Sequence, residues 1–394
     1  MQPIALPVLS GEVNLALPVD WQLEIVQVRE ARELSAGEMS AVFDTPIDSP
    51  PLAELARGNK SAMIVAEDCM RSTPVERLLP GVVNRLLAGG LREDQIRFIL
   101  ATGMHRAQNG ADVRAKLGRE IVERFEVLPH NPYENLVFLG ETARGIPVWV
   151  NRWVAESDLK IGVGGVVPHS GAGFGGGAKI VMPGVCGIET VAAHHEGVPR
   201  GGATLDENAW RAEIETIARM IGLDFVVNAV INGRRQAAGL FVGDMVAAHR
   251  KAAAFADSLY RVGLPRDMDI ALVSGYPMDQ EIAQARKAVR TAASCVRSGG
   301  SIVLFGDCPE GAGFHALYGA GGRFQEITRA GLENGLGGKQ VWVCSSGVST
   351  YDVRQYLPLS TIVVNDPQRL VGHLAEQYPQ ARVCVLRQGT LLIG

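Results

Sequence analysis

Apolar and polar positions alternate along the 394-residue chain in a way that predicts two consecutive α/β domains. Short apolar runs typical of buried strands alternate with amphipathic helical segments, the pattern of largely parallel sheets flanked by helices. The alternation restarts after residues 265–268. We therefore expect an N-terminal domain of residues 1–264 and a doubly wound domain of residues 265–394, with the active site in the cleft between them.

The expected elements follow the hydrophobic pattern closely. Residues 13–30 suit strands or a hairpin at a sheet edge. Further strands are predicted at 61–68, 95–101, 135–139, 146–150, 159–167, 224–232, 270–274, 301–305, 340–344, 361–364 and 382–386. Helices are predicted at 74–88, 109–125 (exposed and amphipathic), 207–222, 241–262, 279–297, 324–332 and 368–377.

Composition narrows the class of protein. Hydrophobic residues make up 47% and charged residues 20%, which suits packed cores. The net charge of -4, without a Lys/Arg cluster, argues against a nucleic-acid partner, and no apolar stretch reaches a membrane-spanning length. Scattered cysteines without a CxxC pair, and a start that lacks a basic region before Glu12, predict a cytoplasmic protein with reduced thiols.

The most distinctive stretch is residues 169–197, HSGAGFGGGAKIVMPGVCGIETVAAHHEG. Residues 171–176 satisfy GxGxxG, but Pro183 interrupts the long helix that a dinucleotide-binding loop must open. Lys179 does not stand in the GK[ST] of a phosphate loop. The pattern favours a cradle of backbone amides with one amine beside it, over a flexible surface loop with a solvated lysine.

Histidines stand at the ends of predicted strands or loops, where ligands and proton donors are usually held. His105, His169 and His195 could together bind zinc, although the chain lacks the close HxH or HExxH spacing. His194 and His195 diverge on a helix, so one of them is expected to face the site. Three further histidines lie in helical or loop contexts and are expected at the surface or as caps: His249, His315 and His373.

Cationic and amide side chains form a third candidate group. Arg71 follows the strand at 61–68, whereas Gln284 and Lys287 lie one turn apart on the helix at 279–297. Each could bind a carboxylate, although a lone lysine on a helix is more often solvated.

Taken together, these stretches resemble the lactate racemase family, whose enzymes use a nickel-pincer nucleotide. The resemblance runs from about Ser61 to Lys287 and keeps the order of the family's motifs. The matching segments are Asp68-x-x-Arg71 with Thr73-Pro74 for DxTRPxP, Gly103-Met104-His105-Arg106 for GTHR, His169 to Lys179 for HxxxGFSGGxK, His195, and Gln284 with Lys287 for QxxK.

The resemblance implies a role for each matched residue. Lys179 would carry the cofactor covalently, His195 would ligate nickel, and His105 and His169 would be the acid/base pair. The substrate would be held by Arg71, Gln284 and Lys287, and the cofactor by Asp68, Gly173, Gly175, Gly176 and Gly177. The implied enzyme is an isomerase, a racemase or epimerase of small 2-hydroxy acids. Hydride would pass reversibly from Cα to the cofactor through a 2-keto acid, and cofactor-synthesis proteins would be transient partners.

Departures from the family's pattern leave the substrate open. Gly175 replaces a serine, Ser72 replaces the usual proline, and Ala283 replaces an aromatic residue, which could admit a larger 2-hydroxy acid. Two other functions stay open at this point: an NAD(P)-dependent 2-hydroxy acid dehydrogenase that uses the second domain, and a non-catalytic binding protein on the same scaffold.

Overall fold

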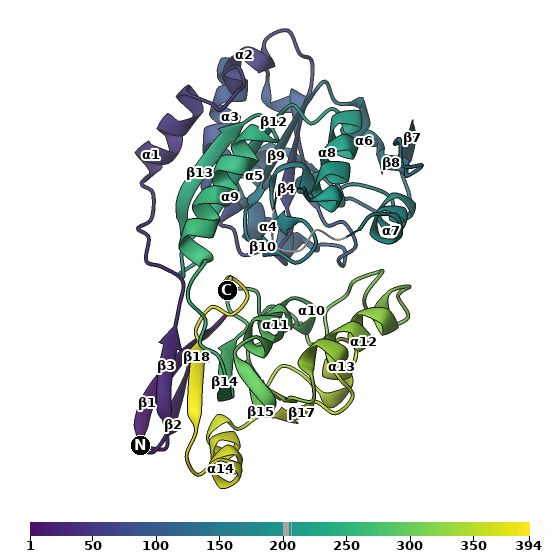
Figure 1. Cartoon of the computed structure of the whole chain (residues 1–394). Helices are drawn as coiled ribbons and strands as arrows, with labels where there is room; N and C mark the ends of the chain where they lie inside the picture. Colours follow the sequence, from purple (N-terminus) through teal and green to yellow (C-terminus); the bar gives the residue numbers. More distant parts are fainter. Residues whose placement is uncertain (200–204, 206) are drawn as a thin grey trace. The chain divides into compact units, whose positions relative to one another are not determined.

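The computed structural model describes residues 1–199, 205 and 207–394. The chain forms two compact units (Figure 1): unit 1 contains Met1–Glu30 and Leu259–Gly394, and unit 2 contains Ala31–Ser258. Each unit is built on a largely parallel sheet flanked by helices, which confirms the expected fold class.

The sheet of unit 2 has the order β13-β12-β9-β4-β5-β6. Every neighbouring pair is parallel except β12 and β13. The strands are β4 (Ala62–Glu67), β5 (Ile96–Ala101), β6 (Glu126–Leu128), β9 (Leu159–Gly165), β12 (Phe225–Ile231) and β13 (Ala237–Gly243). The buried sequence of β4, AMIVAE, shows why these strands form, since both faces are covered.

Helices and small sheets surround this sheet. They are α1 (Ala36–Ala41), α2 (Leu52–Ala56), α3 (Leu79–Ala88), α4 (Gly110–Leu117), α5 (Arg119–Arg124), α6 (Arg152–Glu156), α7 (Ile188–Gly197), α8 (Ala209–Ile221) and α9 (Ala247–Tyr260), with the hairpins β7 (Leu136–Glu141)–β8 (Pro147–Asn151) and β10 (Pro168–His169)–β11 (Gly173–Phe174). The short 3-10 helix η4 (Gly177–Ile180) packs directly on β9. A Cβ on Gly162 would lie 2.3 Å from Ile180 Cγ2, so this close packing requires glycine.

Two helix predictions in unit 2 are wrong in part. Residues 241–262 were expected to be helical throughout, but 241–243 complete β13, which returns beside β12 after a tight turn. The expected exposed helix at 109–125 is two helices, because the chain turns at Gly118, whose φ is 84°. Lys116 and Leu117 at the end of α4 are buried.

The sheet of unit 1 is parallel throughout, in the order β17-β16-β15-β14-β18-β3. Its strands are β3 (Gln22–Val26), β14 (Met268–Ser274), β15 (Val296–Phe305), β16 (Gln340–Cys344), β17 (Ile362–Val364) and β18 (Arg382–Leu386). Its helices are α10 (Ile282–Ala285), α11 (Lys287–Ala293), α12 (Gln325–Leu336), α13 (Thr350–Arg354) and α14 (Pro367–Gln377). The single helix expected at 279–297 is therefore two short ones, and it ends four residues early because β15 begins at Val296.

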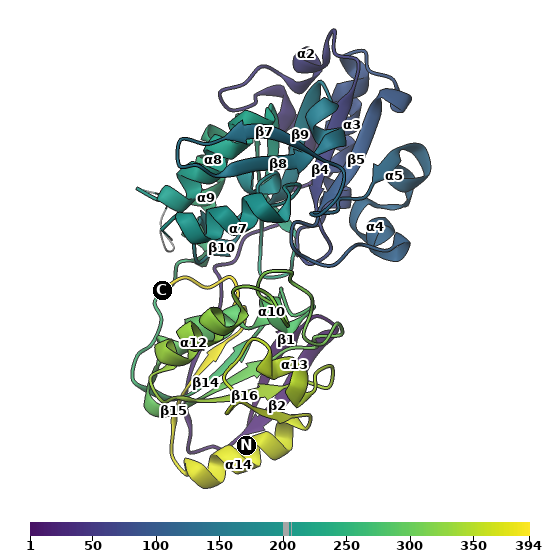
Figure 2. The same cartoon turned by 90° about the vertical axis from the view of Figure 1, so that its right-hand side faces the viewer.

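The N-terminal residues belong to unit 1, whereas the sequence pattern placed them with residues 31–264. β3 pairs with β18 (Figure 1), and the hairpin β1 (Gln2–Val8)–β2 (Gly11–Leu17) lies beside α14 (Figure 2). Leu6 and Leu17 enter the same core as Leu370, which explains why this segment joins the last strands of the chain.

None of the helices in the described part of the chain has the length and the apolar character needed to cross a membrane.

Candidate active site

The predicted site residues of unit 2 follow three neighbouring parallel strands. Asp68 and Arg71 come directly after β4, His105 follows β5, and His169 follows β9. β4 lies between β5 and β9, so the three loops emerge at one carboxyl edge of the sheet.

His105 is held by Asp68. Its Nδ1 lies 2.6 Å from Asp68 Oδ2, and both side chains are largely buried. Burial would raise the pKa of the Asp68 carboxyl, but the hydrogen bond of His105 and its charge when protonated, together with the charges of Arg71 and Lys116, lower the pKa below its usual value. A carboxylate accepts hydrogen bonds only, so Nδ1 donates to Asp68, and in the neutral ring Nε2 then keeps a lone pair. The basic nitrogen of the neutral His105 ring is therefore Nε2.

A buried ion pair fixes the loop that carries Asp68. Lys116 Nζ lies 2.9 Å from Glu67 Oε1 and donates to the carbonyls of Arg71 and Thr73, each at 2.9 Å. The other Glu67 oxygen accepts from Gly165 N at 2.7 Å. This pair ties the loop after β4 to the end of β9.

Replacing Lys116 with methionine is expected to lower the free energy of unfolding by about 3–5 kcal/mol, because Glu67 would remain buried without its cation. Urea denaturation measures the change. Arg119→Met provides the control, since Arg119 and Glu123 form an exposed pair and its loss should cost less than about 1 kcal/mol. Equal losses in the two variants would contradict the role given to Lys116.

His169 opens the glycine loop, residues 171–177. The antiparallel pairing of β10 and β11 places it opposite Gly173. Its Nδ1 accepts from the amides of Gly171 and Ala172, both at 3.1 Å, so the hydrogen of the neutral ring lies on Nε2. Nε2 lies 3.5 Å from Lys179 Nζ. His105 and His169 are therefore held in different states, one with a lone pair and one with a hydrogen at Nε2.

The pKa of the Lys179 amine is lowered by its surroundings. Burial lowers its pKa to about 7, and the positive charges of Arg211 and Arg71 act in the same direction. The lowered pKa increases the unprotonated fraction of the Lys179 amine at neutral pH, and only that form has a lone pair.

The labelling rate of Lys179 by trace acetic anhydride is expected to rise with pH and to reach half its maximum near pH 7. The sign follows from the lowered pKa, because the reactive amine appears as pH rises through 7 rather than through its ordinary value of 10.5. Peptide mass spectrometry gives the rate, with exposed Lys251 as the internal reference. A midpoint above pH 9 for Lys179 would contradict the prediction.

Backbone geometry explains the glycines before Lys179. Gly176 and Gly177 have φ values of 72° and 57°. A Cβ would lie 2.6 Å from Val166 Cγ2 at the first position and 2.9 Å from the His249 ring at the second. Gly177 N donates to Asn228 Oδ1 at 2.8 Å, and no described residue partners the buried Asn228 Nδ2.

Both histidines of α7 pack against the Trp210 ring, and their own ring centroids lie 5.5 Å apart, so the expected divergence of the two side chains is not seen. His194 is fully buried and its Nε2 donates to Trp210 O at 3.1 Å, while burial lowers its pKa to about 4. His195 is half-buried and lies edge-on to the Trp210 ring, with centroids 4.7 Å apart. His195 is therefore the more accessible of the two.

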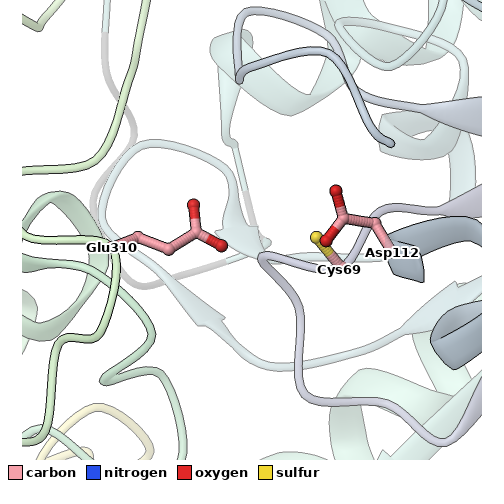
Figure 3. A group of neighbouring side chains, drawn as sticks. All are labelled: Cys69, Asp112 and Glu310. Carbon is pink, nitrogen blue, oxygen red and sulfur yellow. The ribbon is translucent and has the colours of Figure 1, made fainter. Parts of the chain in front are cut away.

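The three-histidine zinc site is not formed. Among the described residues, His105, His169 and His195 do not appear in any group of possible ligand atoms that lie within 4.8 Å of one another. Cys69 lies beside Asp112 in unit 2 (Figure 3), but Arg106 already pairs with that carboxylate. Glu310, also drawn there, belongs to unit 1, and the two ligand atoms of unit 2 are too few to hold a metal ion.

The predicted pair in unit 1 is in contact. Lys287 Nζ, at the start of α11, donates to Gln284 Oε1 on α10 at 2.6 Å. Gln284 is buried and Lys287 is half-buried, so the ammonium is the more accessible group.

Three supporting residues were missed from the sequence. Arg211 and His249 are buried, and both had a signal, since each lies on the apolar stripe of its helix. Arg211 is spaced three and seven residues from Ile214 and Ala218. Asn228 lies within a uniformly apolar strand, where a lone amide is the signal. His249 was expected at the surface or as a cap, and that prediction is wrong, because the side chain is buried and bonds to Gly175 O.

Two family models match the chain. The lactate racemase N-terminal domain matches residues 10–204, and the lactate racemase C-terminal domain matches residues 263–333. The lactate racemase of Lactiplantibacillus plantarum is 32% identical over 284 residues, which are 70% of this chain and 67% of that protein. The chain belongs to the lactate racemase family. This places it among the isomerases.

Other relatives agree. The lactate racemase of Thermoanaerobacterium thermosaccharolyticum is 28% identical over 285 residues, 70% of this chain and 66% of that protein. The matched stretch thus spans about two thirds of either racemase. Among solved structures, a lactate racemase apoprotein from the same organism superposes with a TM-score of 0.81 at 22% identity, covering 100% of this chain and 99% of that one. A Thermotoga maritima protein superposes with a TM-score of 0.66 at 18% identity, covering 92% and 99%.

Proposed function

We propose that this chain is a racemase or epimerase of small 2-hydroxy acids that uses a nickel-pincer nucleotide tethered to Lys179. The observation that carries the proposal is the pairing of a nucleophilic lysine with two histidines held in different states at one sheet edge. The relatives named for lactate make lactate the first substrate to test.

The residues present fit such a cofactor. Gly176 and Gly177 pack against Val166 and His249 where a side chain would collide, which fixes the path of the backbone just before Lys179. Lys179 offers an amine that is partly unprotonated at neutral pH. Asp68 Oδ1 and Asn228 Nδ2 are buried without partners among the described residues, so a bound ligand could satisfy them. Imidazole is a suitable ligand for nickel, and His195 is the accessible imidazole of α7.

When bound, the nucleotide would supply the group that takes hydride from the substrate Cα and returns it. His105 Nε2 would accept the substrate's hydroxyl proton as the 2-keto acid forms, while Asp68 stabilises the resulting imidazolium. His169 Nε2 would donate a hydrogen bond to the keto oxygen. To take a proton from the opposite enantiomer, the His169 ring must first release the Gly171 and Ala172 amides.

Cations would hold the substrate's carboxylate. Arg71 lies near enough to lower the pKa of Lys179 by its charge, and its guanidinium can bind a carboxylate through two parallel hydrogen bonds. Gln284 and Lys287, in contact in unit 1, are proposed to serve the same substrate. Proteins that build and insert the nucleotide would be transient partners.

The test is to co-express the chain with a nickel-pincer biosynthesis pathway and measure intact mass, nickel content and chirality. The holo protein should carry added mass on Lys179 and should interconvert the enantiomers of lactate or of a larger 2-hydroxy acid. Because hydride is returned to the same carbon, product formed in D2O should retain its α-hydrogen. A nickel-loaded protein that interconverts no 2-hydroxy acid would overturn the proposal, as would stoichiometric binding of a nicotinamide nucleotide instead.

A further inference from the structure

The side chain of Arg211 binds backbone carbonyls along the glycine loop, residues 171–177. This arginine on α8 is 1% exposed, and its guanidinium makes three hydrogen bonds to backbone carbonyls. Nε donates to Ala172 O at 3.3 Å and Nη1 to Gly176 O at 3.2 Å, while Nη2 donates to Phe174 O. The three acceptors alternate along the loop, so one rigid planar group fixes its path.

Other side chains complete this pattern. Asn208, which caps α8, donates through Nδ2 to Gly171 O at 3.1 Å, and His249 on α9 donates through Nε2 to Gly175 O at 2.8 Å. Side chains thus bind the carbonyls of residues 171, 172, 174, 175 and 176. Because C=O and N–H point in opposite directions across a planar peptide, the amides that follow these carbonyls face away from the two helices.

His249 is locked as a donor. Arg250 Nη1 donates to its Nδ1 at 3.1 Å and also binds Glu215 at 2.7 Å, so the hydrogen of the His249 ring lies on Nε2. Burial lowers the pKa of His249 well below its usual value, and the charge of Arg211 adds to the effect. The ring therefore stays neutral, and its bond to Gly175 persists at neutral pH.

We propose that Arg211 is the positioning residue that sets the shape of the loop at 171–177 and thereby directs the amine of Lys179. His249 supports it at one carbonyl. The inference rests on the proposed function only in treating Lys179 as the reactive group, since the contacts themselves belong to the chain alone.

The electrostatics agree with this geometry. Burial lowers the pKa of Arg211 to about 9, which leaves it charged at neutral pH. After burial, the Arg211 charge is the next cause of the low pKa of Lys179. The loop carbonyls bind the guanidinium while it remains near the lysine, so the same residue shapes the loop and favours the unprotonated amine.

The test uses the full chain without cofactor and compares Arg211→Met, Arg211→Lys and Arg219→Met. Arg219 is an exposed arginine on the same helix and serves as the matched control. Hydrogen exchange followed by mass spectrometry measures the protection of residues 171–177. The pH dependence of Lys179 acetylation measures the state of the amine.

In Arg211→Met, we expect loop amides to exchange at least about tenfold faster, because hydrogen bonds from a charged donor are lost. The midpoint of Lys179 labelling should shift above pH 7. Arg211→Lys keeps the charge with fewer fixed donors, so exchange should accelerate while the midpoint stays closer to that of the parent. Arg219→Met should match the parent in both readouts.

Parent-like loop exchange and an unchanged labelling midpoint in Arg211→Met would overturn the proposal. If that variant does not fold, Arg211→Lys decides: faster exchange confined to 171–177 supports the role, whereas no change, or faster exchange throughout unit 2, overturns it. These readouts need neither nickel nor substrate. If the enzyme failed to racemise 2-hydroxy acids, the role of Arg211 in shaping the loop would be unaffected. If the Arg211 variants matched the parent, the proposed racemase activity would be unaffected.

Discussion

Replacing Lys179 with arginine or alanine is expected to abolish cofactor attachment and to reduce racemisation to below about one thousandth of the parent rate. Arginine keeps a positive charge but stays protonated and cannot act as a nucleophile, so charge alone should not restore activity. Intact mass of protein co-expressed with the cofactor pathway measures attachment, and chiral chromatography measures the rate.

The Lys179→Ala variant should fold at least as well as the parent, whereas Lys179→Arg places a permanent charge in the same site. The low pKa of Lys179 means that the folded chain disfavours its protonated form. Between pH 7 and 10 the unfolded chain therefore binds more protons than the folded one, and the stability contributed by this residue rises with pH. Lys179→Ala removes this penalty, so its largest gain in stability should occur at or below pH 7.

Lys251→Ala, on exposed α9 surface, is the matched control and should keep both the added mass and the activity. Added mass that persists in Lys179→Arg would place the attachment elsewhere on the chain. That result would remove the main support for the proposed cradle.

The strands could be predicted because each buried strand is a continuous run of apolar residues in the local sequence. Apolar runs such as 62–67 and 225–231 are covered on both faces, and polar residues mark where the sheet edge begins. The loops that carry Asp68, His105 and His169 were found for the same reason, since parallel strands bring their carboxyl ends to one edge.

What the sequence could not provide is the long-range pairing of polar groups. The partner of Glu67 is Lys116, 49 residues later, and nothing local distinguishes that lysine from a solvated one. The joining of β3 to β18 is equally non-local, because their register depends on residues 360 positions apart, such as Val26 and Leu386. Such contacts are fixed by the fold as a whole.

The overlap between β13 and the helix expected at 241–262 is limited to residues 241–243 and has a simpler cause. The apolar residues Phe241 and Val242 fit the end of a buried strand as well as the start of a helix. The tight turn after β12, with Asn232 N donating to Gln236 O at 2.9 Å, decides in favour of an antiparallel return. The turn after β12 therefore determines that residues 241–243 form a strand, although the hydrophobic pattern predicted a helix there.

Replacing Asp68 with asparagine is expected to lower kcat by about 10²- to 10⁴-fold, the range of a lost acid/base contribution. The asparagine amide can donate to His105 Nδ1, which would move the ring's hydrogen to Nε2 and remove the lone pair that should accept the substrate's proton. KM should change little, since the carboxylate is proposed to orient the base rather than to hold the substrate. Steady-state kinetics on the nickel-loaded enzyme measures both constants.

Asp112→Asn is the matched control, because Asp112 is also a hydrogen-bonded carboxylate of unit 2 but its partner is Arg106 rather than a histidine. Acid stability gives an independent check. The pKa of Asp68 is lowered in the folded chain, so its contribution to stability is complete above the unfolded value of 3.8 and is lost as pH falls through the folded value. Asp68→Asn should therefore flatten the loss of stability below about pH 4. A variant that flattened this loss yet kept the parent kcat would show that Asp68 stabilises the loop without setting the state of His105.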